Sequence, residues 1–218
     1  MARTDADPDV EETFADEDAP PVDPPEQGLR RFAGWLSIAG LLGGSAAFAL
    51  TVDKLRLAQD PSFVPSCNLN PVINCGNVMS TDQASAFGFP NSIIGVGAFA
   101  VLATIGVGLL AGARFRPWFW AGLQVGALFG VGFVHWLAYE SMFRIGSLCP
   151  WCMVVWTVML PTFLSVTSYT LATGQFGAGP VGAGRWLRRH YAEVLLVWYL
   201  MFIGVAGVQF WDYWQTLF

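Results

Sequence analysis

Charged residues are scarce in this chain, and most of the acidic ones are concentrated at one end. Of the 218 residues, 12% are charged and 54% are hydrophobic, whereas about 25% of a typical soluble domain is charged. Residues 1–27 contain ten of the sixteen acids, which leaves six acids and ten bases for the other 191 residues. So few charges cannot solvate a soluble surface, and we expect lipid to surround most of the chain.

The first 27 residues lack both a basic start and an early apolar run, so they show no signal-peptide pattern. The segment DADPDVEETFADEDAPPVDPPEQ is acidic and rich in proline. Because such a segment has too little apolar surface to form a core, residues 1–29 are predicted to be a disordered cytoplasmic tail. The tail is either a solvated extension or a docking or regulatory segment. Residues 30–218 are predicted to form one transmembrane domain.

The rest of the sequence consists of long apolar runs that lack the alternation typical of β-barrel strands. A helix needs about 20 apolar residues to cross the hydrocarbon core of a bilayer. Five stretches meet this requirement, at about residues 32–52, 91–112, 117–139, 150–172 and 191–210. The sequence therefore predicts an all-α membrane protein with five transmembrane helices.

Basic residues are distributed unevenly between the two sides of these predicted spans. One side carries Arg3, Arg30, Arg31, Arg114, Arg116, Arg185, Arg188 and Arg189, and the other carries Lys54, Arg56 and Arg144. Since cytoplasmic loops carry the excess of basic residues, the amino terminus is predicted to be cytoplasmic. The loop 53–90 and the start of the fourth span then face the outside of the cell.

Cysteine is also rare, and the predicted orientation places all four cysteines on the outer side. Cys67 and Cys75 lie in the loop 53–90, and Cys149 and Cys152 begin the fourth span. Disulfides persist on the oxidising side of a membrane. Four cysteines allow three sets of pairings. One set contains the two local bridges Cys67–Cys75 and Cys149–Cys152, and each of the other two sets joins the loop cysteines to the helix cysteines.

The Cys149-x-x-Cys152 motif has the features of a reactive pair. A helix start favours a thiolate at Cys149, and Cys152 lies one turn further on the same face, where an apolar oxidant could reach it. The cysteine spacing is poor for zinc, so no metal site is expected, and no βαβ pattern indicates a thioredoxin-like domain. We interpret the four cysteines as a redox relay, with two structural disulfides as the alternative.

Several other small or polar residues lie within the predicted spans. Gly122, Gly126 and Gly130 predict close helix packing, with a groove for a flat ligand as the alternative. Gln124 and His135 share one helix face, and one interpretation of His135 is a bond to a neighbouring helix. A further group is expected at the edges of the helices: Tyr139 and Glu140 at the membrane boundary, and Asn91 either as a helix N-cap or as a ligand-binding residue.

Three motifs together resemble the vitamin K epoxide reductase family in its bacterial form. They are CNLNPVINCGNVMST in the outer loop, FGFPNSIIG at the second span and LCPWC at the fourth. The resemblance covers about residues 32–172, and the fifth span is the usual bacterial addition. It implies a four-helix transmembrane bundle around a quinone, with a fifth, peripheral transmembrane helix. The implied location is a bacterial inner membrane, with the cysteines on the periplasmic face.

The resemblance also implies an order of electron transfer and a set of quinone-binding residues. Thiols of a partner would attack the Cys67–Cys75 bridge at Cys67, and the freed Cys75 would attack Cys149. Cys152 would then donate to the quinone, which is menaquinone or ubiquinone. The expected quinone-binding residues are Asn91, Phe87, Trp156, Met79 and His135, the last as a proton donor.

The sequence therefore predicts a membrane thiol:quinone oxidoreductase that supports disulfide formation in exported proteins. Its expected partner is a secreted or membrane-anchored thioredoxin-fold (DsbA-like) protein that acts in trans, because no thioredoxin domain follows the fifth span. Nucleic acid is not an expected partner. Two other hypotheses stay open, namely a transmembrane electron carrier and a structural or transport membrane protein with inert disulfides.

Overall fold

Five long helices make up most of the molecule. The computed structural model describes residues 26–217, so residues 1–25 of the predicted acidic tail lie outside the described part. The long helices are α1 (Glu26–Gln59), α3 (Asn91–Leu110), α4 (Pro117–Tyr139), α5 (Pro150–Ala172) and α7 (Tyr191–Gln209). All five are long and apolar enough to cross a membrane, which confirms the predicted all-α fold of a multi-pass membrane protein. The division into a tail and a transmembrane domain at residue 30 stays a prediction.

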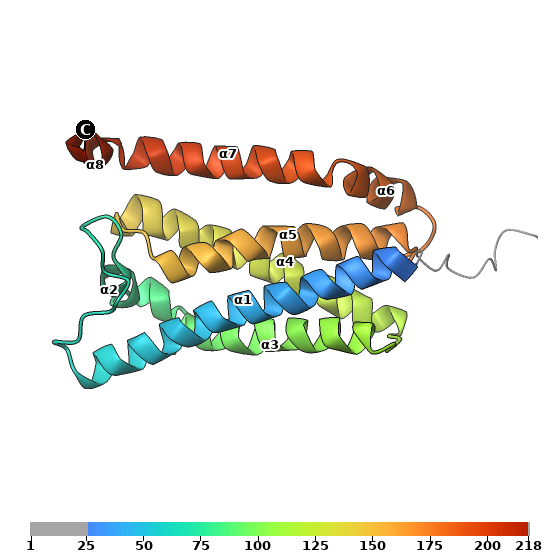
Figure 1. Cartoon of the computed structure of the whole chain (residues 1–218), viewed down its shortest axis with the longest axis horizontal. Helices are drawn as coiled ribbons and strands as arrows, with labels where there is room; N and C mark the ends of the chain where they lie inside the picture. Colours follow the sequence, from blue (N-terminus) through green and yellow to red (C-terminus); the bar gives the residue numbers. More distant parts are fainter. Residues whose placement is uncertain (1–25, 218) are drawn as a thin grey trace, which may run out of the picture.

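Short elements cap the two ends of the bundle. They are α2 (Cys75–Met79), η2 (Asp82–Ser85), η3 (Glu140–Ile145), α6 (Val181–Arg189), α8 (Trp211–Trp214) and η4 (Gln215–Leu217). Figure 1 shows α2, the start of α5 and α8 at one end of the molecule, and α6 with the start of α1 at the other. The two ends therefore differ in character, because the first holds the cysteines and the second holds Arg30 and Arg31 of α1 together with the arginines of α6.

Helix α1 is longer than its predicted span and packs closely on α3. It has 34 residues, which correspond to about 50 Å of helix at 1.5 Å per residue. A Cβ atom at Gly40 would lie 2.5 Å from the backbone nitrogen of Ala103, and one at Gly106 would lie 2.5 Å from that of Ser37. Glycine thus allows the two backbones to approach, as is common between membrane helices.

Helices α1, α3, α4 and α5 form the predicted four-helix bundle, although they do not all touch. Helix α1 packs against α3 and α5, and α4 packs against α5, whereas α3 and α4 scarcely touch. Since α3 and α4 follow each other in the chain, their separation leaves the bundle open between two consecutive helices. This opening borders an apolar cavity that is lined by residues of both helices.

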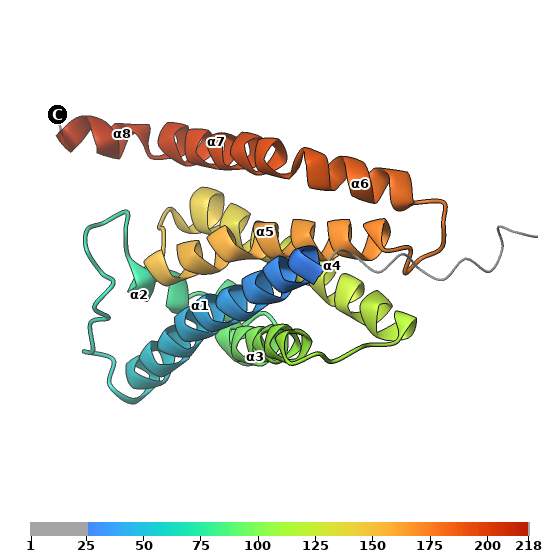
Figure 2. The same ribbon diagram turned by 45° about the vertical axis from the view of Figure 1, so that its right-hand side comes forward.

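Helix α7 lies outside this bundle, as predicted for the fifth span. No residue of α7 is buried, and both views show it running along the outer side of α5 (Figures 1 and 2). Pro161 lies inside α5 and has no N–H, so the Thr157 carbonyl one turn earlier lacks its helical donor. The Tyr199 hydroxyl donates to that carbonyl at 2.7 Å, and the Tyr191 hydroxyl donates to the Pro161 carbonyl at 3.0 Å. Polar contacts of this kind attach α7 to the bundle.

Removing the Tyr199 hydroxyl should weaken the attachment of α7. We expect Tyr199→Phe to lower the free energy of unfolding by about 1 kcal/mol, a magnitude typical of hydrogen bonds between membrane helices. The loss follows because the Thr157 carbonyl is left without a donor, and unfolding in detergent measures it. Tyr139→Phe removes a hydroxyl from a half-exposed ring and serves as the control. Equal stability of the two variants would contradict the prediction.

Candidate redox site and apolar cavity

A backbone bridge holds the outer loop against the segment that leads into α5. Ile73 and Leu148 form an isolated parallel β-bridge. The Leu148 N–H donates to the Val72 carbonyl at 2.7 Å, and the Asn74 N–H donates to the Leu148 carbonyl at 2.9 Å. Each of these two segments continues directly into a cysteine. The bridge therefore determines which two cysteines meet.

Asparagine side chains of the loop accept hydrogen bonds from its backbone N–H groups, a function that the sequence motifs did not indicate. Asn70 Oδ1 accepts two loop N–H groups, at 3.0 and 2.6 Å. Asn68 Oδ1 accepts the Gly76 N–H at 2.9 Å, and the Asn74 side chain caps α2. The Asn-Pro dipeptide at residues 70–71 is a turn signal that could have indicated part of this structure. These bonds give an irregular loop one defined conformation.

The loop disulfide meets a free thiol at the start of α5. Cys67 and Cys75 are bonded to each other, and Cys149 and Cys152 are free thiols. The Sγ atom of Cys149 lies 3.2 Å from the Sγ atom of Cys75. Cys75 and Cys149 are fully buried, whereas Cys67 is 7% exposed. The three sulfurs are close enough for thiol–disulfide exchange, which needs only access and alignment.

The position of Cys149 favours its thiolate form. Cys149 directly precedes Pro150, the first residue of α5. A hydrogen bond from the Cys152 thiol lowers the pKa of Cys149 below its ordinary value, and the backbone N–H groups of Cys152 and Trp151 add to this effect. Burial and the carboxylate of Asp53 act in the opposite direction but are outweighed. A lowered pKa gives more of the attacking thiolate at neutral pH.

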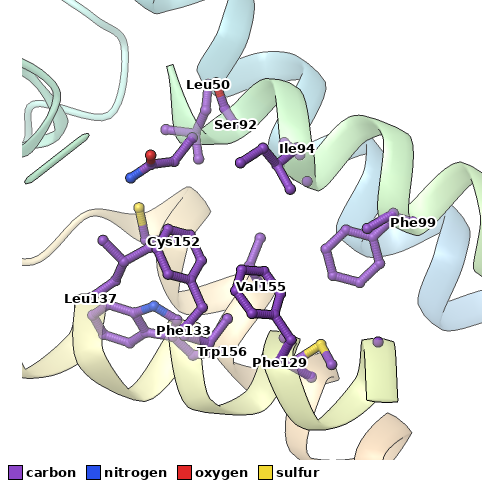
Figure 3. Close-up of a pocket in the computed structure, with 18 of the residues that line it drawn as sticks. Leu50, Ser92, Ile94, Phe99, Phe129, Phe133, Leu137, Cys152, Val155 and Trp156 are labelled. Carbon is purple, nitrogen blue, oxygen red and sulfur yellow. The ribbon is translucent and has the colours of Figure 1, made fainter. Parts of the chain in front are cut away.

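Cys152 lines an apolar cavity of about 570 Å³. Figure 3 shows this cavity with Ile94 and Phe99 of α3 on one side and Cys152, Trp156 and Phe133 on the other. The cavity occupies the opening between α3 and α4, and its volume lies in the range of about 300–1,000 Å³ that is usual for small-molecule sites. Aromatic and aliphatic walls of this kind fit a flat apolar ring with a hydrocarbon tail.

The glycines of α4 correct one prediction. Gly122, Gly126 and Gly130 line the cavity. A Cβ atom at Gly122 or Gly126 would meet nothing within 4 Å, whereas one at Gly130 would lie 2.6 Å from the Met159 side chain. Close helix packing was therefore wrong for Gly122 and Gly126, because no helix within residues 26–217 covers that face of α4. The alternative prediction, a groove for a flat ligand, agrees with the open space beside these two glycines.

Three of the five expected quinone-binding residues line the cavity, namely Asn91, Met79 and Trp156. Asn91 is the first residue of α3, so it does not occupy the predicted N-cap position. Its Nδ2 donates to the Gln83 carbonyl at 2.6 Å, and its Oδ1 accepts the Ala86 N–H at 3.0 Å. Asn91 therefore fastens the preceding loop to α3 at the edge of the cavity.

Phe87 lies outside the set of described residues that line the cavity. Its side chain is 50% exposed, and its ring centroid lies 5.5 Å from that of Phe133, which does line the cavity. Phe87 therefore packs behind Phe133, which forms a wall of the cavity.

His135 and Gln124 also point to neighbouring helices. The Trp198 Nε1–H of α7 donates to His135 Nε2 at 2.8 Å, and His135 Nδ1 lies 2.7 Å from the Val131 carbonyl. Both ring nitrogens are thus occupied, and His135 is not among the described cavity residues. Gln124 donates to Thr167 of α5 at 2.9 Å. The rotation of α4 directs the His135 ring to α7 and not to the described cavity, which agrees with the alternative of a bond to a neighbouring helix.

Five candidate spans, a disulfide in contact with a thiol, and an apolar cavity beside a second thiol define a multi-pass membrane thiol–disulfide oxidoreductase. Residues 34–167 match the model of the Vitamin K epoxide reductase family. The chain belongs to this family, and the family predicted from its motifs is confirmed. It is accordingly a quinone-dependent enzyme with a thiol-redox partner. A search of curated proteins found no significant match.

The hydrogen bond between the two α5 cysteines makes a prediction for Cys149. In protein whose loop cysteines are both replaced by serine, Cys152→Ala is expected to raise the pKa of Cys149, because the thiol that donates to it is lost. Ultraviolet absorbance of the thiolate measures this during a pH titration. Cys152→Ser keeps a donor and should retain most of the lowered pKa. An unchanged titration midpoint in Cys152→Ala would refute the assigned cause.

Proposed function

We propose that the protein reoxidises an exported thioredoxin-fold (DsbA-like) protein and passes the electrons to a membrane quinone, and so supports disulfide formation outside the cytoplasm. The observation that carries this proposal is the 3.2 Å distance between the sulfurs of Cys75 and Cys149. Cys152, one turn further along α5, lines the cavity. The same helix start thus connects the loop disulfide to the quinone site.

The relay begins at the loop disulfide. A thiolate of the partner attacks Cys67, the more exposed of the two bonded sulfurs, and Cys75 leaves as a thiolate. Cys75 attacks Cys149 of a Cys149–Cys152 disulfide, and Cys152 leaves as a thiolate. The second thiol of the partner then releases Cys67 and completes the partner's own disulfide. Cys67 attacks Cys75 and re-forms the loop bridge, which leaves Cys149 and Cys152 reduced.

The described arrangement corresponds to the end of that sequence, with the loop disulfide formed and both α5 thiols free. Re-forming the Cys149–Cys152 disulfide from the Cys149 thiolate and the Cys152 thiol releases two electrons and one proton. When bound, a quinone accepts two electrons and two protons and becomes a hydroquinone. Cys152 lies against the cavity and Trp156 lies one turn deeper, so α5 brings both the reacting sulfur and an aromatic wall to the ring of menaquinone or ubiquinone.

The distribution of arginines supports the proposed orientation in a bacterial inner membrane. Arg30 and Arg31 of α1 and the three arginines of α6 lie at the end opposite the cysteines (Figure 1). Cytoplasmic segments carry the excess of basic residues. The amino terminus then faces the cytoplasm, residues 30–218 act as one transmembrane domain, and the disulfides face the periplasm, where an exported partner reaches them.

Turnover with purified components tests the relay. The protein in detergent should consume a short-chain quinone when a reduced thioredoxin-fold donor is added, as followed by quinone absorbance. Cys149→Ala and Cys152→Ala should each abolish this turnover. Cys152→Ala should also accumulate a Cys75–Cys149 disulfide, detectable by mass spectrometry, because no resolving thiol follows. Normal turnover of both variants would show that the disulfides are inert.

Filling the cavity should separate quinone reduction from thiol exchange. Gly126→Leu places a side chain in the open space beside α4 that the ligand would occupy. A steric cost of about 1–3 kcal/mol corresponds to a rise of about 5- to 150-fold in the quinone KM. Gly132→Leu is the matched control, because Gly132 lies on the same helix, is exposed and is not one of the described cavity residues. An equal effect of both substitutions would argue against a quinone in this cavity.

A further inference from the structure

Glu140 is a buried acid at the cysteine end of the cavity. It was expected at the membrane boundary, but its side chain is only 8% exposed and it lines the cavity. Helix α4 changes at this residue into the π-helical segment η3. Such irregular turns occur frequently at functional sites. Because a buried ionisable group inside a membrane protein is costly, its presence calls for a function.

The surroundings of Glu140 contain few groups that could neutralise it. Gln83 Nε2 of η2 lies 3.4 Å from Glu140 Oε2, and no ion pair of Glu140 occurs within residues 26–217. The charged or titratable groups that share the cavity are Lys54 of α1 and Cys152 of α5. The Lys54 ammonium donates to the Met79 carbonyl.

The elements packed against η3 include α2, α4 and α7, and their titratable groups have other partners or lie at the surface. On α4, both ring nitrogens of His135 are occupied and Tyr139 is half-exposed. On α7, the Tyr191 and Tyr199 hydroxyls bond to α5 and Glu193 is exposed, and the only cysteine of α2 is in the disulfide. On η3 itself, Arg144 is exposed to solvent. Glu140 is therefore the one carboxyl group among the described residues of the cavity.

Quinone reduction has a requirement that the cysteines meet only in part. Two electrons come from the sulfurs of Cys149 and Cys152 as they form a disulfide, and two protons must reach the quinone oxygens. Cys149 reacts as a thiolate and has already given up its proton, so a second group must supply one. A carboxyl group that lines the cavity can donate this proton and regain it from water.

We propose that Glu140 donates a proton to the quinone site during reduction and is held for this by Gln83. In each turnover Glu140 gives one proton to a quinone oxygen and takes one back from the outer aqueous side along η2, so it is unchanged at the end. This inference rests on the proposed function, since it assigns a residue to the same reaction. It also places proton uptake on the same side of the membrane as the disulfides.

The test compares Glu140→Gln with the matched substitution Glu193→Gln at the exposed start of α7. Loss of a proton donor typically costs about 100-fold or more in rate, so quinone reduction by Glu140→Gln should fall by about 100-fold. Glu140→Asp, which keeps a carboxyl group, should restore part of the rate, and Glu193→Gln should behave like the wild type.

Two further measurements separate proton donation from a structural function. Infrared spectra without quinone should show a carboxyl band in the wild type and in Glu193→Gln that is missing in Glu140→Gln. In the Cys152→Ala background, Glu140→Gln should leave formation of the Cys75–Cys149 disulfide unchanged. A wild-type rate in Glu140→Gln, no such carboxyl band, or impaired disulfide exchange would each overturn the inference. An inactive wild-type enzyme would instead overturn the proposed function.

Discussion

The chemistry of this protein depends on one short backbone contact between segments that are far apart in the sequence. The Ile73–Leu148 bridge joins the outer loop to the start of α5, and without it the two cysteine pairs would belong to separate structures. Thiol–disulfide exchange requires sulfur atoms in contact, and a flexible loop would reach this geometry only at an entropic cost. The loop asparagines reduce that cost, because their side chains satisfy backbone groups that no helix or sheet would satisfy. A hydrogen bond of 3.1 Å from Asn77 to Ser147 adds a side-chain contact to the same interface.

The bundle around this contact follows the energetics of helices in lipid. Apolar helices gain little from excluding lipid, so small residues and interhelical hydrogen bonds determine which faces pack. Gly40 brings α1 against α3, whereas among the described helices Gly126 of α4 has no partner and leaves open space. The same residue type thus produces a tight contact at one place and part of a cavity at another. Likewise, Pro161 leaves the Thr157 carbonyl of α5 without a helical donor, and the Tyr199 hydroxyl of α7 donates to it. A missing hydrogen bond within one helix thus becomes a contact that attaches another helix.

The cysteine end of the cavity combines groups with different functions in a small space. Cys152 provides a sulfur, Trp156 provides an aromatic wall, and Glu140 provides a buried carboxyl group. Electrons and protons would then reach the quinone from the same side of the membrane, so the reaction would move no net charge across the bilayer. The buried acid is tolerated because the loop residue Gln83 contacts it. The packing of residues 53–90 against the helices therefore positions the sulfur atoms and also provides the hydrogen-bond partner of the Glu140 carboxyl group.

Sequence alone was sufficient for the number and type of the helices, the cysteine motifs and the family, because apolar length and motif spacing are local properties. It could not determine the rotation of each helix about its axis, since these helices are apolar on nearly every face and periodicity carries little information. For that reason His135 was assigned to the cavity although it bonds to Trp198, and Glu140 was assigned to the boundary although it is buried. The contact between Cys75 and Cys149 likewise depends on a bridge between residues 75 positions apart. Only the tertiary structure decided these features, because each depends on which neighbour a side chain meets after the helices have packed.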